Sequence, residues 1–152
     1  MTTPAFRRAL ASDLPAIVAL LADDELGRTR EEPGPPPSPR YAAAFATIDA
    51  DPHQLLAVAD AGGEVVGCFQ LTFIPSLART GMWRGQIEGV RVARGHRGSG
   101  IGREMFAWAI EECRRRGCSL VQLTTDKGRP DAHGFYAALG FIASHEGMKL
   151  AL

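Results

Sequence analysis

The sequence lacks a surplus of charge of either sign, since 17 lysines and arginines are balanced by 17 aspartates and glutamates. Proteins whose main partner is a nucleic acid usually carry a basic stripe, so we expect no nucleic-acid partner. Long apolar runs are also missing: no stretch reaches the about eighteen residues that span a bilayer, and residues 1–13 lack the apolar core of a signal peptide. These absences predict a cytoplasmic protein with no membrane partner.

Cysteine is scarce as well, with three residues in the chain. Cys68, Cys113 and Cys118 are odd in number and have no paired metal-ligand spacing, which argues against a disulfide framework. We expect inert, partly buried thiols. His133 and His145 also have no partner at metal-ligand spacing, so no metal site is predicted.

What the chain does have is enough apolar sequence for one core. With 152 residues, 45% of them hydrophobic, it is long enough for one compact domain over residues 1–152 and too short for two well-packed ones. Residue patterns predict a mixed α/β (α+β) fold. Strands are predicted at 5–10, 54–60, 64–74, 84–92, 119–125, 141–144 and 148–152, and helices at 12–26, 41–50, 101–116 and 131–140. Five prolines and two glycines between Gly27 and Pro39 predict an irregular surface loop.

A glycine-rich turn at residues 92–104, VARGHRGSGIGRE, joins a predicted strand to a predicted helix. The start of a helix has unpaired N–H groups and a partial positive charge, and glycines let a phosphate approach them. A P-loop would require Lys followed by Ser or Thr where Arg103 and Glu104 stand. A dinucleotide fingerprint would require GxGxxG, whereas the glycines here are spaced GxGxG. The turn therefore predicts a phosphate-bearing cofactor held in another way.

The pattern R/Q-x-x-G-x-G/A fits residues 97–102, RGSGIG, without a gap. Together with FYAALGF at residues 135–141, this segment resembles the GCN5-related N-acetyltransferases (GNAT family), which move an acetyl group from acetyl-CoA to an amine. The resemblance implies a central, mostly antiparallel, twisted sheet of about six to seven strands, with strands four and five splayed apart and about four flanking helices. It also implies acetyl-CoA as co-substrate.

Within this resemblance, the CoA pyrophosphate is assigned to backbone N–H groups of the turn, and the pantetheine arm to the strand before it. The cofactor-binding residues that it implies are Val90, Arg91, Val92, Arg97, Gly98, Ser99, Gly100, Ile101, Gly102 and Arg103. The backbone carries this prediction, because exposed arginine side chains beside a loop are often only solvated.

Glu88 is the candidate general base. An alkyl ammonium has a pKa of about 10.4 and is almost fully protonated at neutral pH, so its attack on a thioester requires a base. Alternation places Glu88 with Val90 and Val92 on one face of a strand expected to be central and mostly buried. The resemblance puts a glutamate base in this region. The alternative is a structural ion pair with Arg84 or Arg129.

Tyr136 matches the tyrosine that protonates the departing thiolate in the resemblance, and a backbone N–H near Val90 matches the donor to the thioester oxygen. The alternative for Tyr136 is packing, since Phe135 and Phe141 beside it belong to the expected core. Many family members have asparagine at the position of Arg129, so the role of Arg129 stays open.

Candidate substrate contacts are Glu25, next to Asp23 and Asp24, together with Trp83 and Asp126. Acidic side chains suit a cationic amine, and we expect the primary amine of a small molecule as acceptor.

Other functional classes remain open. The fold could bind an acyl-CoA as a regulatory module without turnover, or the acceptor could be a protein or peptide amine. The apolar ends of residues 64–74 and 148–152 could also form a homodimer edge.

Overall fold

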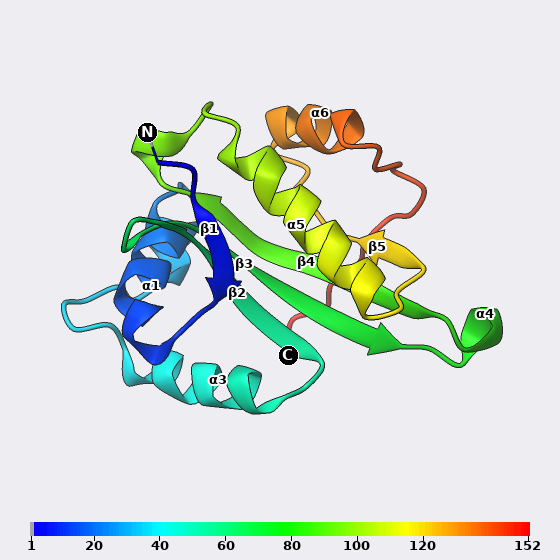
Figure 1. Ribbon diagram of the computed structural model, residues 1–152, viewed down its shortest axis with the longest axis horizontal. Coiled ribbons are helices and arrows are strands. Elements are labelled where there is room, and N and C mark those ends of the chain that lie inside the picture. The colour runs from blue at the N-terminus through cyan, green and yellow to red at the C-terminus, as the bar shows by residue number, and fades with distance from the viewer. Residues whose placement is uncertain (1) are drawn as a thin grey trace. The chain divides into compact units, whose positions relative to one another are not determined.

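The computed structural model describes residues 2–152, which form two compact units, one up to Gln122 and one from Leu123 to Leu152. The larger unit contains one five-stranded sheet in the order β1-β2-β3-β4-β5 (Figure 1). Neighbouring strands are antiparallel except for β4 and β5, which are parallel. The strands are β1 (Ala5–Arg8), β2 (Gln54–Ala61), β3 (Glu64–Pro75), β4 (Trp83–Val92) and β5 (Leu120–Gln122).

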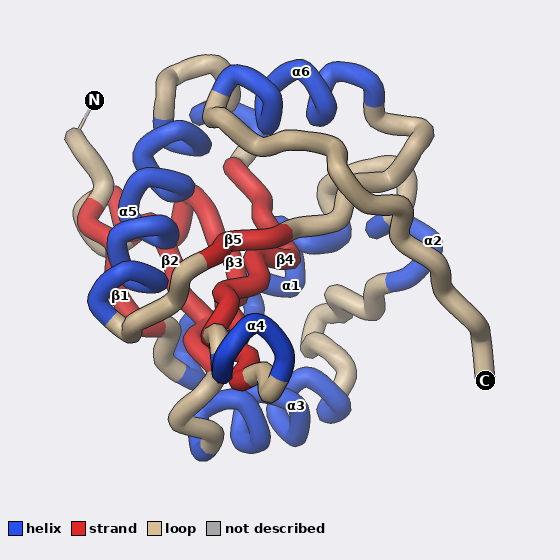
Figure 2. Tube along the Cα trace, turned by 90° about the vertical axis from the view of Figure 1, so that its right-hand side faces the viewer, coloured by secondary structure: helices blue, strands red, loops and turns tan. Residues whose placement is uncertain are grey.

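Helices cover both faces of this sheet. The helices of the larger unit are α1 (Leu14–Ala22), α2 (Gly27–Arg30), α3 (Pro39–Ala50), α4 (Ala78–Gly81) and α5 (Ile101–Arg115), with 3₁₀ turns η1 (Ala11–Asp13) and η2 (Arg94–His96). Figures 1 and 2 show α5 on one face and α1 with α3 on the other. The chain runs from the end of β4 through η2 and the predicted glycine-rich turn to the start of α5.

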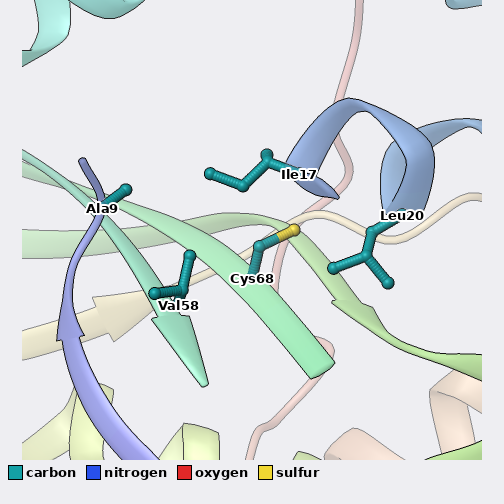
Figure 3. Packing of buried hydrophobic residues seen from close by; sticks show 5 residues of the cluster. All are labelled: Ala9, Ile17, Leu20, Val58 and Cys68. Atoms are coloured by element: carbon teal, nitrogen blue, oxygen red, sulfur yellow. The ribbon is translucent and has the colours of Figure 1, made fainter. Parts of the chain in front are cut away.

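The core on the α1 face is a cluster of buried side chains from α1, β2, β3 and the residue that follows β1 (Figure 3). Its members are Ala9, Ile17, Leu20, Val58 and Cys68. On the opposite face Phe69 meets Trp108 of α5 edge-on, with ring centroids 5.7 Å apart. A β-carbon at Gly85 would lie only 2.3 Å from the Cys113 Sγ, so glycine is what lets α5 approach β4 closely.

The smaller unit contains one helix, α6 (Pro130–Ala138). Within it the Tyr136 ring packs edge-on against Phe135 and Phe141, at centroid distances of 5.5 and 6.1 Å. Gly140, with φ of 94°, ends the helix in a left-handed conformation and turns the chain toward Phe141.

The fold class and most elements agree with the predictions, but the sheet has five strands. Residues 141–144 and 148–152 were predicted as strands, and the structure gives them no strand partner. Their apolar side chains are open to solvent, with Met148 91% and Leu150 86% exposed, so the alternating pattern there has no covered face. Residues 27–30, expected to be irregular, form the single turn of α2.

Cys68 and Cys113 are buried and unbonded, as expected, and burial raises the pKa of each thiol to about 12. The part of the chain that the structure describes contains no helix with both the length and the apolar character needed to cross a membrane. Among residues 2–152 no group of three or more His, Cys, Asp or Glu side chains is placed to hold a metal ion.

Candidate functional site

A bulge divides β4. The register between β3 and β4 shifts between Cys68 and Gln70, so that Phe69 lies opposite two residues of β4, Gly89 and Val90. Gly89 has φ of 63°, a left-handed conformation that glycine adopts at little cost. The bulge bends β4 immediately after Glu88.

Beyond the bulge β4 has an open edge. β5 pairs only with residues 84–86 of β4, so within residues 2–122 no strand pairs with the same edge from Ile87 to Val92. The N–H of Ala93 donates to the Val66 carbonyl of β3 at 2.8 Å. Because peptide groups alternate along a strand, those of Val92 and Val90 face the open edge. This agrees with the predicted splaying of strands four and five.

The turn after β4 leaves a run of backbone donors unused. Among the described residues, five N–H groups of the turn and the first turn of α5 donate to no protein acceptor. They belong to Gly98, Gly100, Ile101, Gly102 and Arg103. A helix start concentrates such donors and a partial positive charge.

Glycine fits this turn for a conformational reason. Gly98 and Gly100 have φ of 77° and 93°, which L side chains rarely adopt, and a β-carbon at either position would meet no atom within 4 Å. The space in front of the donors is therefore open to a ligand. The residues present fit a diphosphate bound through main-chain N–H groups.

Acidic residues at the end of α1 hold the arginines around this turn. Asp23 lies 2.9 Å from Arg94 and 3.1 Å from Arg97, and Asp24 lies 3.1 Å from the Arg91 Nε. The Arg97 Nε also donates to the Val92 carbonyl at 3.0 Å. Much of the acidic cluster is thus paired within the protein and is not available to a cationic substrate.

Glu88 is exposed, which differs from the expectation of a mostly buried position. The part of the sheet face that carries Glu88 lies beyond the cluster covered by α1. Within residues 2–122 no ion pair includes Glu88, and Arg84 instead donates to the Ser76 hydroxyl, so the predicted alternative of a pair with Arg84 is not found. The alternative of a pair with Arg129, which belongs to the smaller unit, stays a prediction. The Glu88 Oε1 accepts a hydrogen bond from the Gln86 amide at 3.5 Å.

A polar row that the sequence analysis missed surrounds Glu88 on this face. Cross-strand partners bring the row together, since Gln70 lies opposite Glu88 and Gln86 opposite Gln122. The row consists of Gln54, Gln70, Thr72, Gln86 and Gln122, all half-buried. Polar residues at alternate positions of 70–72 and 84–88 were the available signal, but their meeting depends on strand register.

The row is joined by hydrogen bonds. The Gln70 amide and the Thr72 hydroxyl both donate to the Gln54 Oε1 at 3.0 Å, and the Gln122 amide donates to the Gln86 Oε1 at 3.0 Å. The hydrogen bond between Gln122 and Gln86 continues to Glu88, because the Gln86 amide nitrogen donates to the Glu88 carboxylate.

The structure does not bring all predicted substrate contacts to this region. Trp83 begins β4, at the end away from the bulge, and its ring lies 5.2 Å from that of His53. Glu25 is exposed between α1 and α2. In the smaller unit the Asp126 carboxylate accepts the Gly128 N–H at 2.8 Å, and its carbonyl accepts the Arg129 N–H at 3.0 Å. Asp126 thus closes its own turn.

Comparison with known proteins identifies the class. The model of the acetyltransferase (GNAT) family matches residues 17–141 of this chain. The chain therefore belongs to the GNAT family, for which acetyl-CoA is the co-substrate, and the predicted family is confirmed.

The chain is also similar in sequence to individual N-acetyltransferases. It is 39% identical to the aminoalkylphosphonate N-acetyltransferase of Salmonella typhimurium over 66% of this chain and 65% of that protein. It is 36% identical to the glucosamine 6-phosphate N-acetyltransferase of Trypanosoma brucei brucei over 59% of each. The chain thus spans less than two thirds of the length of these curated relatives.

Among solved structures, a protein of Bacillus halodurans C-125 described as a transcriptional regulator superposes with a TM-score of 0.95. It is 50% identical over 98% of this chain and 99% of that one.

Proposed function

We propose that this chain transfers the acetyl group of acetyl-CoA to the primary amine of a small molecule that also carries a phosphoryl or phosphonyl group. The run of unused N–H groups from Gly98 to Arg103, next to the open edge of β4, is the observation that carries this proposal. Both curated relatives are named for substrates that combine an amine with phosphorus chemistry, an aminoalkylphosphonate and glucosamine 6-phosphate.

The main chain would hold the cofactor in two stretches. The N–H groups of Gly98, Gly100 and the first turn of α5 would bind the diphosphate, and Ser99 would shape the turn between them. The open-edge peptide groups of Val90 and Val92 would pair with the pantetheine arm, in the way an added strand pairs with a sheet edge. Arg91 and Arg97 support this arrangement through their ion pairs with the end of α1.

Acetyl-CoA supplies an acyl group activated as a thioester. Glu88 would accept one proton of the substrate ammonium, so that the free amine nitrogen bonds to the carbonyl carbon. As the carbon–sulfur bond breaks, the nitrogen would lose its second proton, which replaces the proton that Tyr136 gives to the thiolate. A Val90 N–H on the open edge would donate to the carbonyl oxygen as negative charge develops there. Exposure of Glu88 supports this role, because the acceptor amine must reach it from solvent.

Tyr136 would donate a proton to the departing thiolate. Its support is the FYAALGF pattern and the ring contacts with Phe135 and Phe141, which fix the ring direction. Asp126 and Glu25 stay candidate substrate contacts. Trp83 has weaker support, because it lies at the far end of β4.

The cellular location, the partners and the oligomeric state of the protein are also proposed. We expect a cytoplasmic protein, with neither a nucleic acid nor a membrane as partner, since the formal net charge is zero. A homodimer is also proposed, and the exposed apolar side chains of Met148, Leu150 and Leu152 support it. Light scattering of wild type and of Leu150→Glu tests this.

Thiol release from acetyl-CoA in the presence of paired amines tests the proposed function. The pairs are 2-aminoethylphosphonate with ethylamine, and glucosamine 6-phosphate with glucosamine, with a lysine-containing peptide as a further arm. We expect amine-dependent release, at least tenfold faster (about 1.4 kcal/mol in transition-state binding) with the phosphorus-bearing member of a pair. Equal rates within both pairs would contradict the substrate class, and preference for the peptide would favour a protein acceptor.

A regulatory acyl-CoA-binding module is the second candidate, because the 50% identical Bacillus protein is described as a transcriptional regulator. Thermal shift together with the thiol-release assay separates the two proposals. Under both proposals, acetyl-CoA at a hundredfold excess over its Kd should stabilise the protein by about 2.7 kcal/mol. Stabilisation without thiol release across the whole amine panel would support the module and overturn the enzyme.

A further inference from the structure

We propose that Gln86 is a positioning residue for Glu88 and that Gln122 in turn fixes the direction of the Gln86 amide. This inference rests on the proposed role of Glu88 as the base. It concerns two side chains that lie on different strands and that no motif of the sequence singles out.

The direction of the Gln86 amide follows from its partners. An amide has a carbonyl oxygen that only accepts and a nitrogen that only donates. The Gln86 Oε1 accepts from the Gln122 Nε2 at 3.0 Å, so the Gln86 nitrogen is turned the other way, where it lies 3.5 Å from the Glu88 Oε1. Gln122 thereby selects the orientation in which Gln86 offers a donor to the carboxylate.

Strand pairing fixes the positions of these two glutamines. Gln86 and Gln122 are direct cross-strand partners, and they are the last pair of the short β4–β5 ladder. Gln86 and Glu88 are two residues apart on β4 and therefore share one face of the sheet. The pairing of β4 with β5 ends at Gln86, and the bulge begins just after Glu88. The Gln86 amide nitrogen therefore donates to Glu88 between the end of this pairing and the bulge.

Fixed donors matter for an exposed carboxylate. Glu88 has several rotatable bonds and no ion-pair partner within residues 2–122, so it would otherwise sample many directions. A hydrogen bond to one oxygen leaves the other oxygen free to accept the substrate proton.

Other charged groups of the larger unit that face this region are already engaged. Arg91 lies on the same sheet face and is paired with Asp24, while Asp23 is paired with Arg94. The Arg84 guanidinium is turned toward the Ser76 hydroxyl at 3.4 Å. Among these neighbours, Gln86 is the side chain that donates a hydrogen bond to Glu88.

The experiment compares Gln86→Met, Gln122→Met and the double variant with wild type, using kcat and KM for the amine and for acetyl-CoA. Methionine keeps the length of the side chain and removes both hydrogen-bonding atoms. We expect Gln86→Met to lower kcat about three- to tenfold, with KM for the amine and for acetyl-CoA unchanged.

The coupling between the two variants is the sharper readout. If Gln122 acts through Gln86, the double variant should have the activity of Gln86→Met alone. Thr72→Val is the matched control, because it removes a 3.0 Å hydrogen bond from the same face in the set that ends at Gln54. It should leave kcat at the wild-type value.

Three results are decisive. A Gln86→Met variant that keeps the wild-type kcat would overturn the inference, as would independent, additive effects of Gln86 and Gln122. An equal loss of kcat in Thr72→Val would overturn it too, since the effect would then be one of general polarity. If Glu88→Gln retains wild-type activity, the proposed base fails instead, which separates the two failures.

Discussion

The two halves of β4 differ although they belong to one strand. From Arg84 to Gln86 the strand has partners on both sides, and Gly85 lies beneath the Cys113 side chain of α5. From Ile87 to Val92 it has one partner, a bulge and an open edge. A strand segment that is paired with a neighbour on each side has a fixed position in the sheet. A segment that is paired on one side only has unpaired backbone groups that can bind a ligand. Mutations in the two halves should therefore affect different properties.

Glu88→Gln should have the largest effect, and it falls on activity. Loss of a general base lowers kcat/KM about 10²- to 10⁴-fold, while acetyl-CoA affinity stays at the wild-type level. Since Glu88 is exposed, the free energy of unfolding should change by less than about 0.5 kcal/mol. Steady-state kinetics and denaturant unfolding measure the two quantities, and a loss below about tenfold would remove Glu88 from the catalytic role.

Gly100→Ala should weaken acetyl-CoA binding about ten- to hundredfold. Alanine is strained at φ of 93°, and relief of the strain would redirect the N–H groups at the start of α5. Gly95→Ala is the control, because Gly95 also has open space around it but lacks a positive φ. Titration calorimetry with acetyl-CoA compares them, and similar affinities for both variants would argue against a diphosphate at this turn.

Gly85→Ala should instead affect stability. The new β-carbon would lie 2.3 Å from the Cys113 Sγ, and overpacking of this kind costs about 1–3 kcal/mol. The cost should shrink in a Cys113→Ala background, where the nearest remaining atom of the side chain, Cβ, is 3.3 Å away. Thermal unfolding of the four proteins tests this, and kcat/KM of the folded fraction should stay near wild type. A loss of activity without a loss of stability would contradict the division of β4.

Asp13→Asn should give the smallest effect, in a region remote from both halves of β4. The Arg7 guanidinium, 2.8 Å away, holds the pKa of the Asp13 carboxyl below its ordinary value of 3.8. A lowered pKa stabilises the fold above about pH 4, and this contribution is lost as pH falls through the folded-state pKa. We expect wild type to exceed Asp13→Asn by about 1 kcal/mol at pH 7, with the difference closing toward pH 2. A difference that is constant across this range would argue against the ion pair.

The accuracy of the sequence predictions depended on how local each feature is. The glycine turn and α5 were predicted within a residue or two because their signals are contiguous: glycines at 98 and 100, then an apolar stripe, then Gly117 with φ of 79°. The exposure of Glu88 was missed, because it depends on where α1 stops covering the sheet. The terminal strands at 141–144 and 148–152 were wrong, since alternation alone supplies no partner strand.

By itself the sequence determined the family, the glycine-rich turn before α5 and the boundaries of the longer helices. Each of these depends on neighbouring residues, through glycine conformation, helix periodicity and a short motif. Tertiary structure alone decided that β4 loses β5 after Gln86 and that Gln122 and Gln86 meet beside Glu88. Those features require strands separated by tens of residues to pair in one register, and register is set by the packing of the whole sheet.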